Sequence, residues 1–243
     1  MRLPRNWVPD PLAAGSDLQL PANVARHLRQ VLRMRTGQEI VLFNGQDGRD
    51  YRARLIQVDR KAVSATIISA TEPEPDPRLS IRLALGISRG ERMDLAIQKS
   101  VELGVQQITP LFSEHTQVRL SGPRRDKRMQ HWQAVIISAC EQSGRRRIPE
   151  LHPAESFSSW LEQREENVLF MDPDAVTGLS GIERPTSELC FLIGPEGGFS
   201  KAERKAALTA GCRAVRLGPR ILRTETAPLA AIAAAQALWG DFL

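Results

Sequence analysis

Residues whose types could do chemistry gather first in the stretch IGPEGGFS, Ile193 to Ser200. Three glycines and a proline surround a single carboxylate, Glu196, directly after the apolar run LCFL. Glycine tolerates positive φ and lets a ligand approach the main chain without a Cβ in the way. The spacing matches neither G-x-G-x-x-G nor the P-loop motif, so dinucleotide and P-loop nucleotide binding gain no support. On composition alone, a tight strand-to-helix turn is an equal alternative to a ligand site.

The second such stretch is LGPRILRTETAP, Leu217 to Pro228. It predicts a loop that enters a helix whose first turn holds Pro228, with Thr224 or Thr226 as the N-cap. Glu225 then lies near a helix N-terminus. There it either complements the helix macrodipole or acts as a catalytic acid or base, and the spacing leaves both open.

Two arginines enclose two apolar residues within this second stretch. Arg220 and Arg223 flank Ile221 and Leu222. This pattern indicates a loop with one buried side and one side that faces a polyanion, because arginine is suited to bidentate phosphate contacts.

The remaining local patterns concern a helix cap at Ser200 and the spacing of the cysteines and histidines. Ser200 and Glu203 have the S-x-x-E spacing of a capping box, so Ser200 is interpreted as a helix cap rather than a nucleophile. The three cysteines, Cys140, Cys190 and Cys212, form no C-x-x-C pair, and the four histidines lack ligand spacing. We therefore expect no disulfide framework and no protein-bound metal.

The second two thirds of the chain predict the elements that position these loops. Apolar strand-like runs alternate with amphipathic helical runs, which is typical of an α/β domain with a mostly parallel, helix-covered sheet. Ligands in such sheets bind beyond the carboxyl ends of the strands. The expected strands are 79–88, 107–112, 167–171, 189–194 and 214–218, and the expected helices are 91–105, 125–143, 200–211 and 227–239.

A short first domain precedes the proline-rich linker candidate 71–78. The β-rich runs 39–44, 51–58 and 62–70 predict a small barrel or curled sheet. Before them, one amphipathic basic helix is expected: Val24, Leu28, Val31 and Leu32 form an apolar stripe, and Arg26, Arg29 and Arg33 form a second, basic stripe. We thus expect two domains, residues 1–72 and 77–243.

Composition narrows the classes of function. The chain of 243 residues is 42% hydrophobic and 25% charged, which is ordinary for a soluble globular protein. No apolar run approaches the roughly 20 residues that span a bilayer, and no signal-peptide core is visible, so we expect a cytoplasmic protein without a membrane partner. Four arginines and no acid lie between Arg26 and Arg35, and a second basic stretch ends at Arg147. These clusters are either phosphate-binding surfaces or solvated helix faces.

Taken together, the two loop motifs resemble those of the RsmE family of 16S rRNA uridine-N3 methyltransferases in the SPOUT superfamily. Four further parts support the resemblance: HLRQVLRMRTGQEI, ERMDLAIQKSVELGVQQITPL, HWQAVIISACEQSGRRRIPE and the short first domain. The resemblance spans nearly the whole chain in the same order.

The resemblance implies an N-terminal PUA-like β-barrel for RNA contact and a SPOUT-type α/β domain tied in a C-terminal trefoil knot. It also implies S-adenosylmethionine as cofactor, 16S rRNA of the small ribosomal subunit as substrate, and a homodimer. The residues expected to bind the cofactor are Met171, Gly194, Pro195, Glu196, Gly197, Gly198, Leu217, Gly218, Ile221 and Leu222. The residues expected to act in catalysis are Glu225 as base, Arg223 as electrostatic stabiliser and Thr224 as the residue that positions them. Those expected to contact RNA are Arg26, Arg29, Arg33, Arg145 and Arg146, the last two near the catalytic cleft.

Two alternatives remain open at this stage. One is an RNA-binding assembly factor that keeps the fold without methyl transfer. The other is a SPOUT enzyme that modifies tRNA, another base or a ribose. Cofactor binding separates the first from the methyltransferase, and the identity of the modified nucleoside separates the second.

Overall fold

Contacts within the computed structural model divide the chain into two compact units. The structure describes residues 3–118, 121–164, 167–186 and 188–242. The first unit holds the residues up to Asp76 together with Cys140–Ile148, and the second holds Pro77–Ala139 and the residues from Pro149 onward. The break after Asp76 falls inside the proline-rich segment 71–78. No signal in the sequence indicated that the segment 140–148 groups with the first unit.

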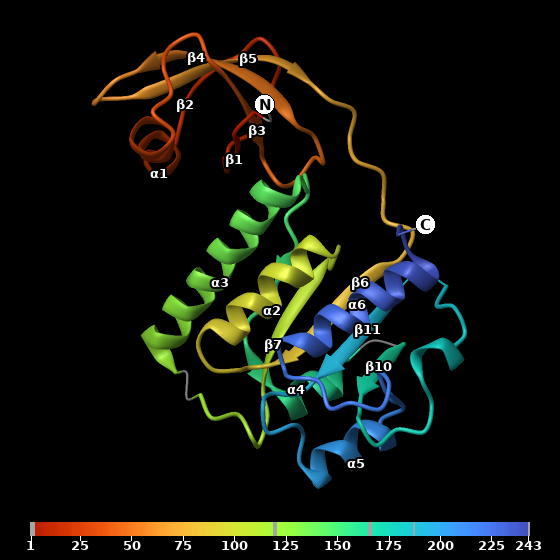
Figure 1. The fold of residues 1–243 in the computed structure, drawn as a ribbon. Coiled ribbons are helices and arrows are strands. Elements are labelled where there is room, and N and C mark those ends of the chain that lie inside the picture. The colour runs from red at the N-terminus through yellow and green to blue at the C-terminus, as the bar shows by residue number, and fades with distance from the viewer. Residues whose placement is uncertain (1–2, 119–120, 165–166, 187, 243) are drawn as a thin grey trace. The chain divides into compact units, whose positions relative to one another are not determined.

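The first unit is a five-stranded sheet with a short helical stretch (Figure 1). Its strand order is β1-β3-β4-β5-β2, with β1 parallel to β3 and the remaining pairs antiparallel. Leu28, Ile40, Leu42 and Leu55 are fully buried in its core. The elements are β1 (Arg5–Trp7), β2 (Asp17–Gln19), α1 (Ala22–Arg26), η1 (His27–Val31), β3 (Glu39–Phe43), β4 (Tyr51–Val58) and β5 (Val63–Ala70).

The predicted basic helix of this unit changes its winding part-way. α1 continues into the π-helical turn η1, where the Leu32 N–H donates to the His27 carbonyl oxygen at 3.1 Å. This i to i+5 winding rotates the residues that follow away from the α-helical stripe. Val24 and Leu28 are buried, but Val31 is 66% and Leu32 41% exposed. The expectation of one apolar stripe is therefore wrong for the last two residues.

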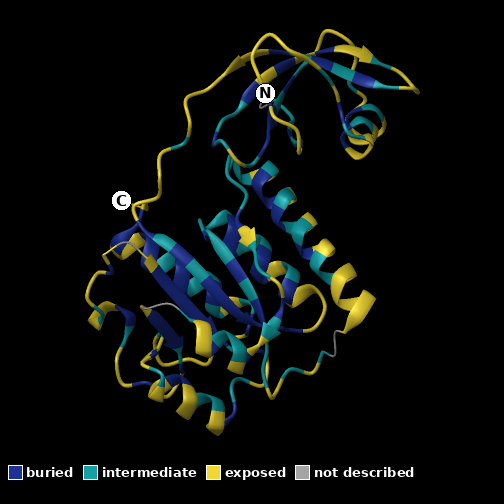
Figure 2. Cartoon of the chain, turned by 180° about the vertical axis from the view of Figure 1, so that it is seen from behind, coloured by how far each residue is buried: buried dark blue, intermediate teal, exposed yellow. Residues whose placement is uncertain are grey.

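The second unit confirms the α/β prediction. In the described part of this unit, seven strands form a parallel sheet in the order β12-β10-β11-β6-β7-β8, with β9 also paired to β7. The strands are buried and the helices expose their outer faces (Figure 2). The strands are β6 (Ser80–Gly86), β7 (Gln107–Phe112), β8 (Glu150–Leu151), β9 (Glu155–Ser156), β10 (Val168–Met171), β11 (Glu188–Ile193) and β12 (Arg213–Val215). The helices are α2 (Glu91–Glu102), α3 (Gly122–Ser143), α4 (Phe157–Gln163), η2 (Leu179–Gly181), α5 (Lys201–Thr209) and α6 (Thr226–Trp239).

Helices cover both faces of this sheet. α4 and α5 pack on one face, where the ring of Phe199 lies 5.1 Å from that of Phe157 and 5.5 Å from that of Phe170. α2 and α6 contact each other and cover the other face. Because both faces are covered, β11 is apolar along most of its length instead of alternating. Its carboxyl end is thereby held firmly where the glycine-rich stretch begins.

α5 begins with the predicted capping box. Ser200 caps α5 as predicted: its Oγ accepts from the Glu203 N–H at 3.2 Å, and the Glu203 carboxylate accepts from the Ser200 N–H at 2.9 Å. α4, β8 and β9 had no sequence prediction, and the trefoil knot stays a prediction. Within the described residues, no helix is long and apolar enough to cross a membrane, and no three His, Cys, Asp or Glu side chains gather as metal ligands would.

Candidate active site

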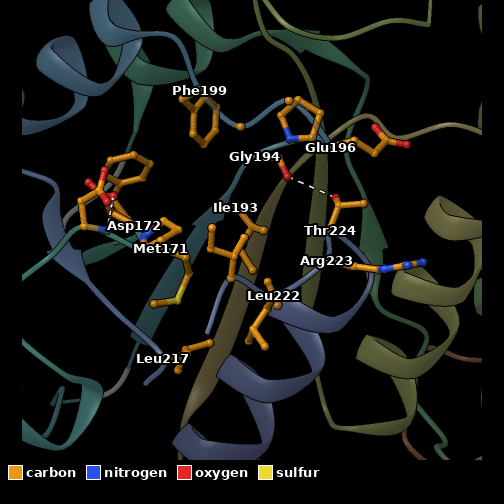
Figure 3. A pocket seen from close by; sticks show the side chains of 18 of the residues that line it. Met171, Asp172, Ile193, Gly194, Glu196, Phe199, Leu217, Leu222, Arg223 and Thr224 are labelled. Atoms are coloured by element: carbon orange, nitrogen blue, oxygen red, sulfur yellow. Dashed lines mark hydrogen bonds between the residues drawn. The ribbon is translucent and has the colours of Figure 1, made fainter. Parts of the chain in front are cut away.

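A cavity of about 570 Å³ opens at the carboxyl ends of β10, β11 and β12 (Figure 3). Three segments form its walls: the glycine loop (Gly194–Gly198), the arginine loop (Leu217–Thr224) and the segment Met171–Asp174 after β10. This is where parallel sheets bind ligands. The cavity is lined by all ten residues that were expected to bind the cofactor, Met171, Gly194, Pro195, Glu196, Gly197, Gly198, Leu217, Gly218, Ile221 and Leu222, and by the expected catalytic residues Arg223, Thr224 and Glu225.

The glycine loop presents bare main chain because side chains do not fit there. A Cβ on Gly194 would lie 3.1 Å from the Gly198 Cα, and Gly198 itself has φ 65°. At Gly86, on the end of β6, a Cβ would lie 2.4 Å from the Pro195 ring. Contacts that short do not occur in folded proteins, so β6 and the glycine loop meet backbone to backbone.

Glu196 fixes the glycine loop to the start of α2. Its carboxylate accepts from the Arg89 N–H at 2.9 Å and from the Arg92 guanidinium at 3.3 Å. Burial raises the pKa of Glu196, but the hydrogen bonds from Arg89 and Arg92 outweigh it, so the pKa lies below its ordinary value of 4.5. The carboxylate thus holds the loop in place.

A loop after β7 adds a further contact to the glycine loop. The imidazole Nδ1 of His115 lies 2.9 Å from the Gly197 carbonyl oxygen. Since a carbonyl oxygen only accepts, this nitrogen carries the proton. Glu203, which completes the capping box of α5, also accepts from the Glu114 N–H at 2.9 Å. Contacts with α2, with α5 and with the loop after β7 therefore hold the glycine loop in place.

The arginine loop is held in a different way from the one predicted. The N-cap of α6 is Glu225 and makes no side-chain cap bond, so the expectation that Thr224 or Thr226 caps this helix is wrong. The Thr224 hydroxyl instead donates to the Gly194 carbonyl oxygen at 3.2 Å (Figure 3). The reason is that Thr224 is buried against the strand ends, where a main-chain acceptor is available. Ile221, expected on a buried side, is 85% exposed at the rim.

An ion pair anchors the third wall of the cavity. Arg204 on α5 donates to both oxygens of the buried Asp172 carboxylate at 2.9 and 2.7 Å, and to Asp174 at 2.9 Å. The hydrogen bond with Asp174, together with the negative charge of Asp172, raises the pKa of Arg204 above its usual range. Through this pair, α5 fixes the segment that carries Met171.

The expected catalytic residues differ in their surroundings. Glu225 lies at the N-terminus of α6, as predicted, and one of its carboxylate oxygens is buried without a hydrogen-bond partner among the described residues. A buried acceptor without a hydrogen-bond partner is energetically unfavourable. This oxygen is therefore available to accept a hydrogen bond or a proton from a ligand. Arg223 is exposed and its side chain extends away from Met171 and Leu217 (Figure 3).

The five arginines expected at RNA all group with the first unit. Arg26 and Arg33 are exposed, and Arg29 donates to the Asp59 carbonyl oxygen at 2.9 Å. Arg145 and Arg146 do not line the cavity. The Arg146 guanidinium donates to the Glu72 carbonyl oxygen at 2.9 Å and lies 3.3 Å from the Asp50 carboxylate, so its charge is partly neutralised inside the unit.

Sequence reasoning missed four residues around the cavity: Ser88, Arg92, His115 and Arg204. Each contacts a cavity wall that lies at least 30 positions away along the chain. No local spacing marks such long-range partners. Arg92 alone carries a weak signal, since a cation in the first turn of α2 is unfavourable for the helix dipole.

Both domains of this chain match the models of known protein families. The model of an RNA methyltransferase domain matches residues 74–236, and that of an RNA methyltransferase PUA domain matches residues 20–68. Ribosomal RNA small subunit methyltransferase E of Buchnera aphidicola from Schizaphis graminum is 34% identical over 99% of this chain and 98% of its own. This chain belongs to the RsmE family of RNA methyltransferases. The predicted family, the PUA-type first domain and the α/β methyltransferase domain are confirmed.

Solved structures extend the RsmE likeness to the whole chain. A ribosomal RNA small subunit methyltransferase E from Neisseria gonorrhoeae, bound to S-adenosylmethionine, is 43% identical with a TM-score of 0.92 and full coverage of both chains. A putative methyltransferase from Legionella pneumophila, in complex with the same cofactor, is 37% identical with a TM-score of 0.95, again over the whole of both chains.

Proposed function

We propose that this RsmE-family protein methylates N3 of a uridine in 16S rRNA of the small ribosomal subunit, with S-adenosylmethionine as methyl donor. The carrying observation is the cavity whose three walls are the loops that the family motifs single out. Both relatives of known structure described above hold this cofactor. Ribosomal RNA is named for the Neisseria relative and for the curated relatives.

The residues that line the cavity fit this cofactor. Ile193, Leu217 and Leu222 offer apolar surface for an adenine ring. At Gly198 and Gly218 a Cβ would touch no protein atom within 4 Å, and both have positive φ, so these positions present bare main chain to open space. Main-chain N–H and C=O groups suit the adenine edge and the methionine carboxylate. We therefore assign cofactor binding to the ten residues that the family resemblance implies.

The expected catalytic residues have distinct tasks in this proposal. When bound, the cofactor supplies an activated methyl group. Uracil N3 is protonated at neutral pH, so the chain must remove that proton; we assign this step to the partnerless carboxylate oxygen of Glu225. Arg223 stabilises the negative charge that develops on the uracil oxygens. Thr224 holds both neighbours in register with the glycine loop.

Nucleoside mass spectrometry tests the proposal directly. The purified protein is incubated with labelled S-adenosylmethionine and small subunits from a strain that lacks this gene. We expect 3-methyluridine in the wild-type reaction and a drop of about 100-fold or more in kcat for Glu225→Gln, the range for loss of a general base. A label on another nucleoside would refute the uridine assignment, and a fully active Glu225→Gln would refute the role of the carboxylate.

The first unit is proposed to bind the rRNA backbone through Arg26, Arg29 and Arg33, with Arg145 and Arg146 as further contacts. Phosphate contacts weaken as salt rises, with a slope that reports how many are made. Neutralising Arg26, Arg29 and Arg33 together should reduce both affinity and salt slope. Arg60→Gln, at an exposed turn of the same unit, is the matched control. An unchanged slope in the triple variant would mean that this helix is ordinary surface.

We also propose that the protein acts as a homodimer in the cytoplasm, as the resemblance implies. Leu95 on α2 and Leu238 on α6 are exposed apolar residues on the two helices that contact each other. Sedimentation at micromolar protein should give twice the 27.0 kDa mass of one chain. A single-chain mass would contradict the dimer.

A further inference from the structure

Ser88 is a buried polar residue in the segment between β6 and α2, with 5% of its surface exposed. It does not line the cavity. Its Oγ lies 2.8 Å from the Thr224 Oγ1, 136 positions along the chain, and 3.4 Å from the Gly86 carbonyl oxygen. Thr224 is itself 7% exposed. Two buried hydroxyl groups therefore meet directly behind the wall where the glycine and arginine loops join.

The direction of these hydrogen bonds follows from the acceptors. The Gly194 carbonyl oxygen only accepts, so the single Thr224 hydroxyl proton points toward it at 3.2 Å. The Thr224 oxygen is then left as an acceptor, and the 2.8 Å contact from Ser88 fills it. The alternative direction, in which Ser88 donates to the Gly86 carbonyl oxygen, uses the longer contact of 3.4 Å and is less favourable. The result is a directed chain from Ser88 through Thr224 to Gly194.

The two loops depend on this chain to different degrees. The glycine loop has independent anchors at Glu196, His115 and the α5 cap. In the arginine loop, among the described residues, the Thr224 hydroxyl makes the hydrogen bonds that reach distant parts of the sequence, and the Arg223 carbonyl oxygen accepts from the adjoining first turn of α6. Breaking the hydrogen bond between Ser88 and Thr224 should therefore move the arginine loop and leave the glycine loop nearly in place.

We propose that Ser88 is a positioning residue for methyl transfer, which acts through the Thr224 hydroxyl to hold Arg223 and Glu225 against the cofactor cavity. This role rests on the proposed function. Ser88 touches neither the cavity nor any charged group in the contacts described above, so its influence passes through one hydroxyl group. Chemistry should respond to its loss more than cofactor binding does, because Arg223 and Glu225 directly flank Thr224, whereas the cofactor is also held by the separately anchored glycine loop.

The test is a set of double-mutant cycles on kcat with small subunits as substrate. Ser88→Ala should lower kcat about fivefold, the effect of one buried hydrogen bond, and change the dissociation constant for S-adenosylmethionine by less than about twofold. In a Thr224→Val background the same substitution should have almost no further effect on kcat. In a Thr224→Ser background, which keeps the hydroxyl, the fivefold loss should return.

A matched control is Ser100→Ala, which removes a hydroxyl that is fully buried in α2 and has no hydrogen-bond partner among the described residues. It should leave kcat unchanged, and thermal unfolding checks that every variant is folded. An active wild type whose Ser88→Ala loss is the same in all three Thr224 backgrounds, or falls on cofactor affinity alone, overturns the role of Ser88. A wild type without rRNA methylation overturns the proposed function and this inference together.

Discussion

The glycine loop and the arginine loop leave neighbouring regions of one parallel sheet, and both contain a Gly-Pro pair, yet the chain secures them in different ways. The glycine loop is packed backbone to backbone on Gly86 and bonded through Glu196 and Gly197. Among the described residues, the hydrogen bonds from the arginine loop to distant parts of the sequence are made by the Thr224 hydroxyl. The glycine loop is therefore held by more long-range contacts than the arginine loop.

This difference matches the tasks proposed for the walls: the glycine loop is assigned to cofactor binding alone, whereas the arginine loop binds the cofactor and also carries Arg223 and Thr224 for catalysis. A cofactor held by main-chain groups needs backbone fixed in advance, since ordering a flexible loop on binding costs free energy and weakens affinity. A wall that must admit a nucleotide gains from a loop that few bonds restrain, and loosely bonded segments open at low free-energy cost. Substitutions in the anchors should therefore have unequal effects on the two loops.

The largest effect is expected for Gly86→Ala, which breaks the strongly held side. The new methyl group would lie 2.4 Å from the Pro195 ring and 2.7 Å from the Gly194 carbonyl carbon, and backbone cannot yield cheaply. We expect a loss of about 3 kcal/mol in the free energy of unfolding and at least about 30-fold weaker binding of S-adenosylmethionine by calorimetry. Gly178→Ala is the control, because φ there is −84° and the nearest atom to the new methyl group, the Ser180 Oγ, would be 4.0 Å away. Equal stability of the two variants would contradict the backbone contact.

Arg204→Ala extends the comparison to the third wall. It leaves the buried Asp172 carboxylate without its cation, while Asp172 keeps the bond from the Asp174 N–H at 3.0 Å. We expect a loss of about 2 kcal/mol in unfolding by denaturant, less than for a fully buried pair because the Arg204 side chain is 35% exposed. Lys205→Ala, at the next and exposed position of α5, should cost little. Matching losses in the two variants would show that the pair does not hold this wall.

The smallest effect is expected at Glu196, because the glycine loop keeps its other anchors. Glu196→Ala should weaken cofactor binding about fivefold, and Glu196→Gln, which still accepts from the Arg89 N–H, about twofold. The pKa of Glu196 is lowered in the folded protein, so its ionised form contributes stability above the unfolded pKa near 4.5 that is lost as pH falls through the folded value. The stability gap between wild type and Glu196→Gln should therefore shrink below about pH 4.5 in chemical unfolding. A gap that is constant with pH would contradict the charge assignment.

Much of this architecture could be predicted because its causes are local. Runs such as YRARLIQV and QITPLF give strands with the predicted bounds, since apolar and β-branched residues fill a run of strand length between turn signals. The S-x-x-E spacing likewise specifies the cap of α5. The cavity lining was predicted through the family resemblance, which the motifs of the two loops carry.

What could not be predicted depends on partners that are distant along the chain. The Thr224 hydroxyl has a helix-capping role in local rules, but its burial against Gly194 and Ser88 overrides that preference. The π-helical turn at His27 has no periodicity of its own, so the exposure of Val31 was missed. The segment 140–148 joins the first unit through bonds such as that from Arg5 to the Cys140 carbonyl oxygen, 135 positions apart.

The pairing of β6 with β11 also limits when this part of the sheet can form during translation. Ser80 is the register partner of Glu188, so the strand that supports the glycine loop is synthesised about 100 residues before the strand it pairs with. At roughly 5–20 residues per second, β6 waits on the order of 5–20 s with that edge unpaired. Such non-local pairing slows folding and leaves an edge open to wrong partners. The cavity can therefore form only late in translation, and a chain released before β11 is synthesised cannot contain it.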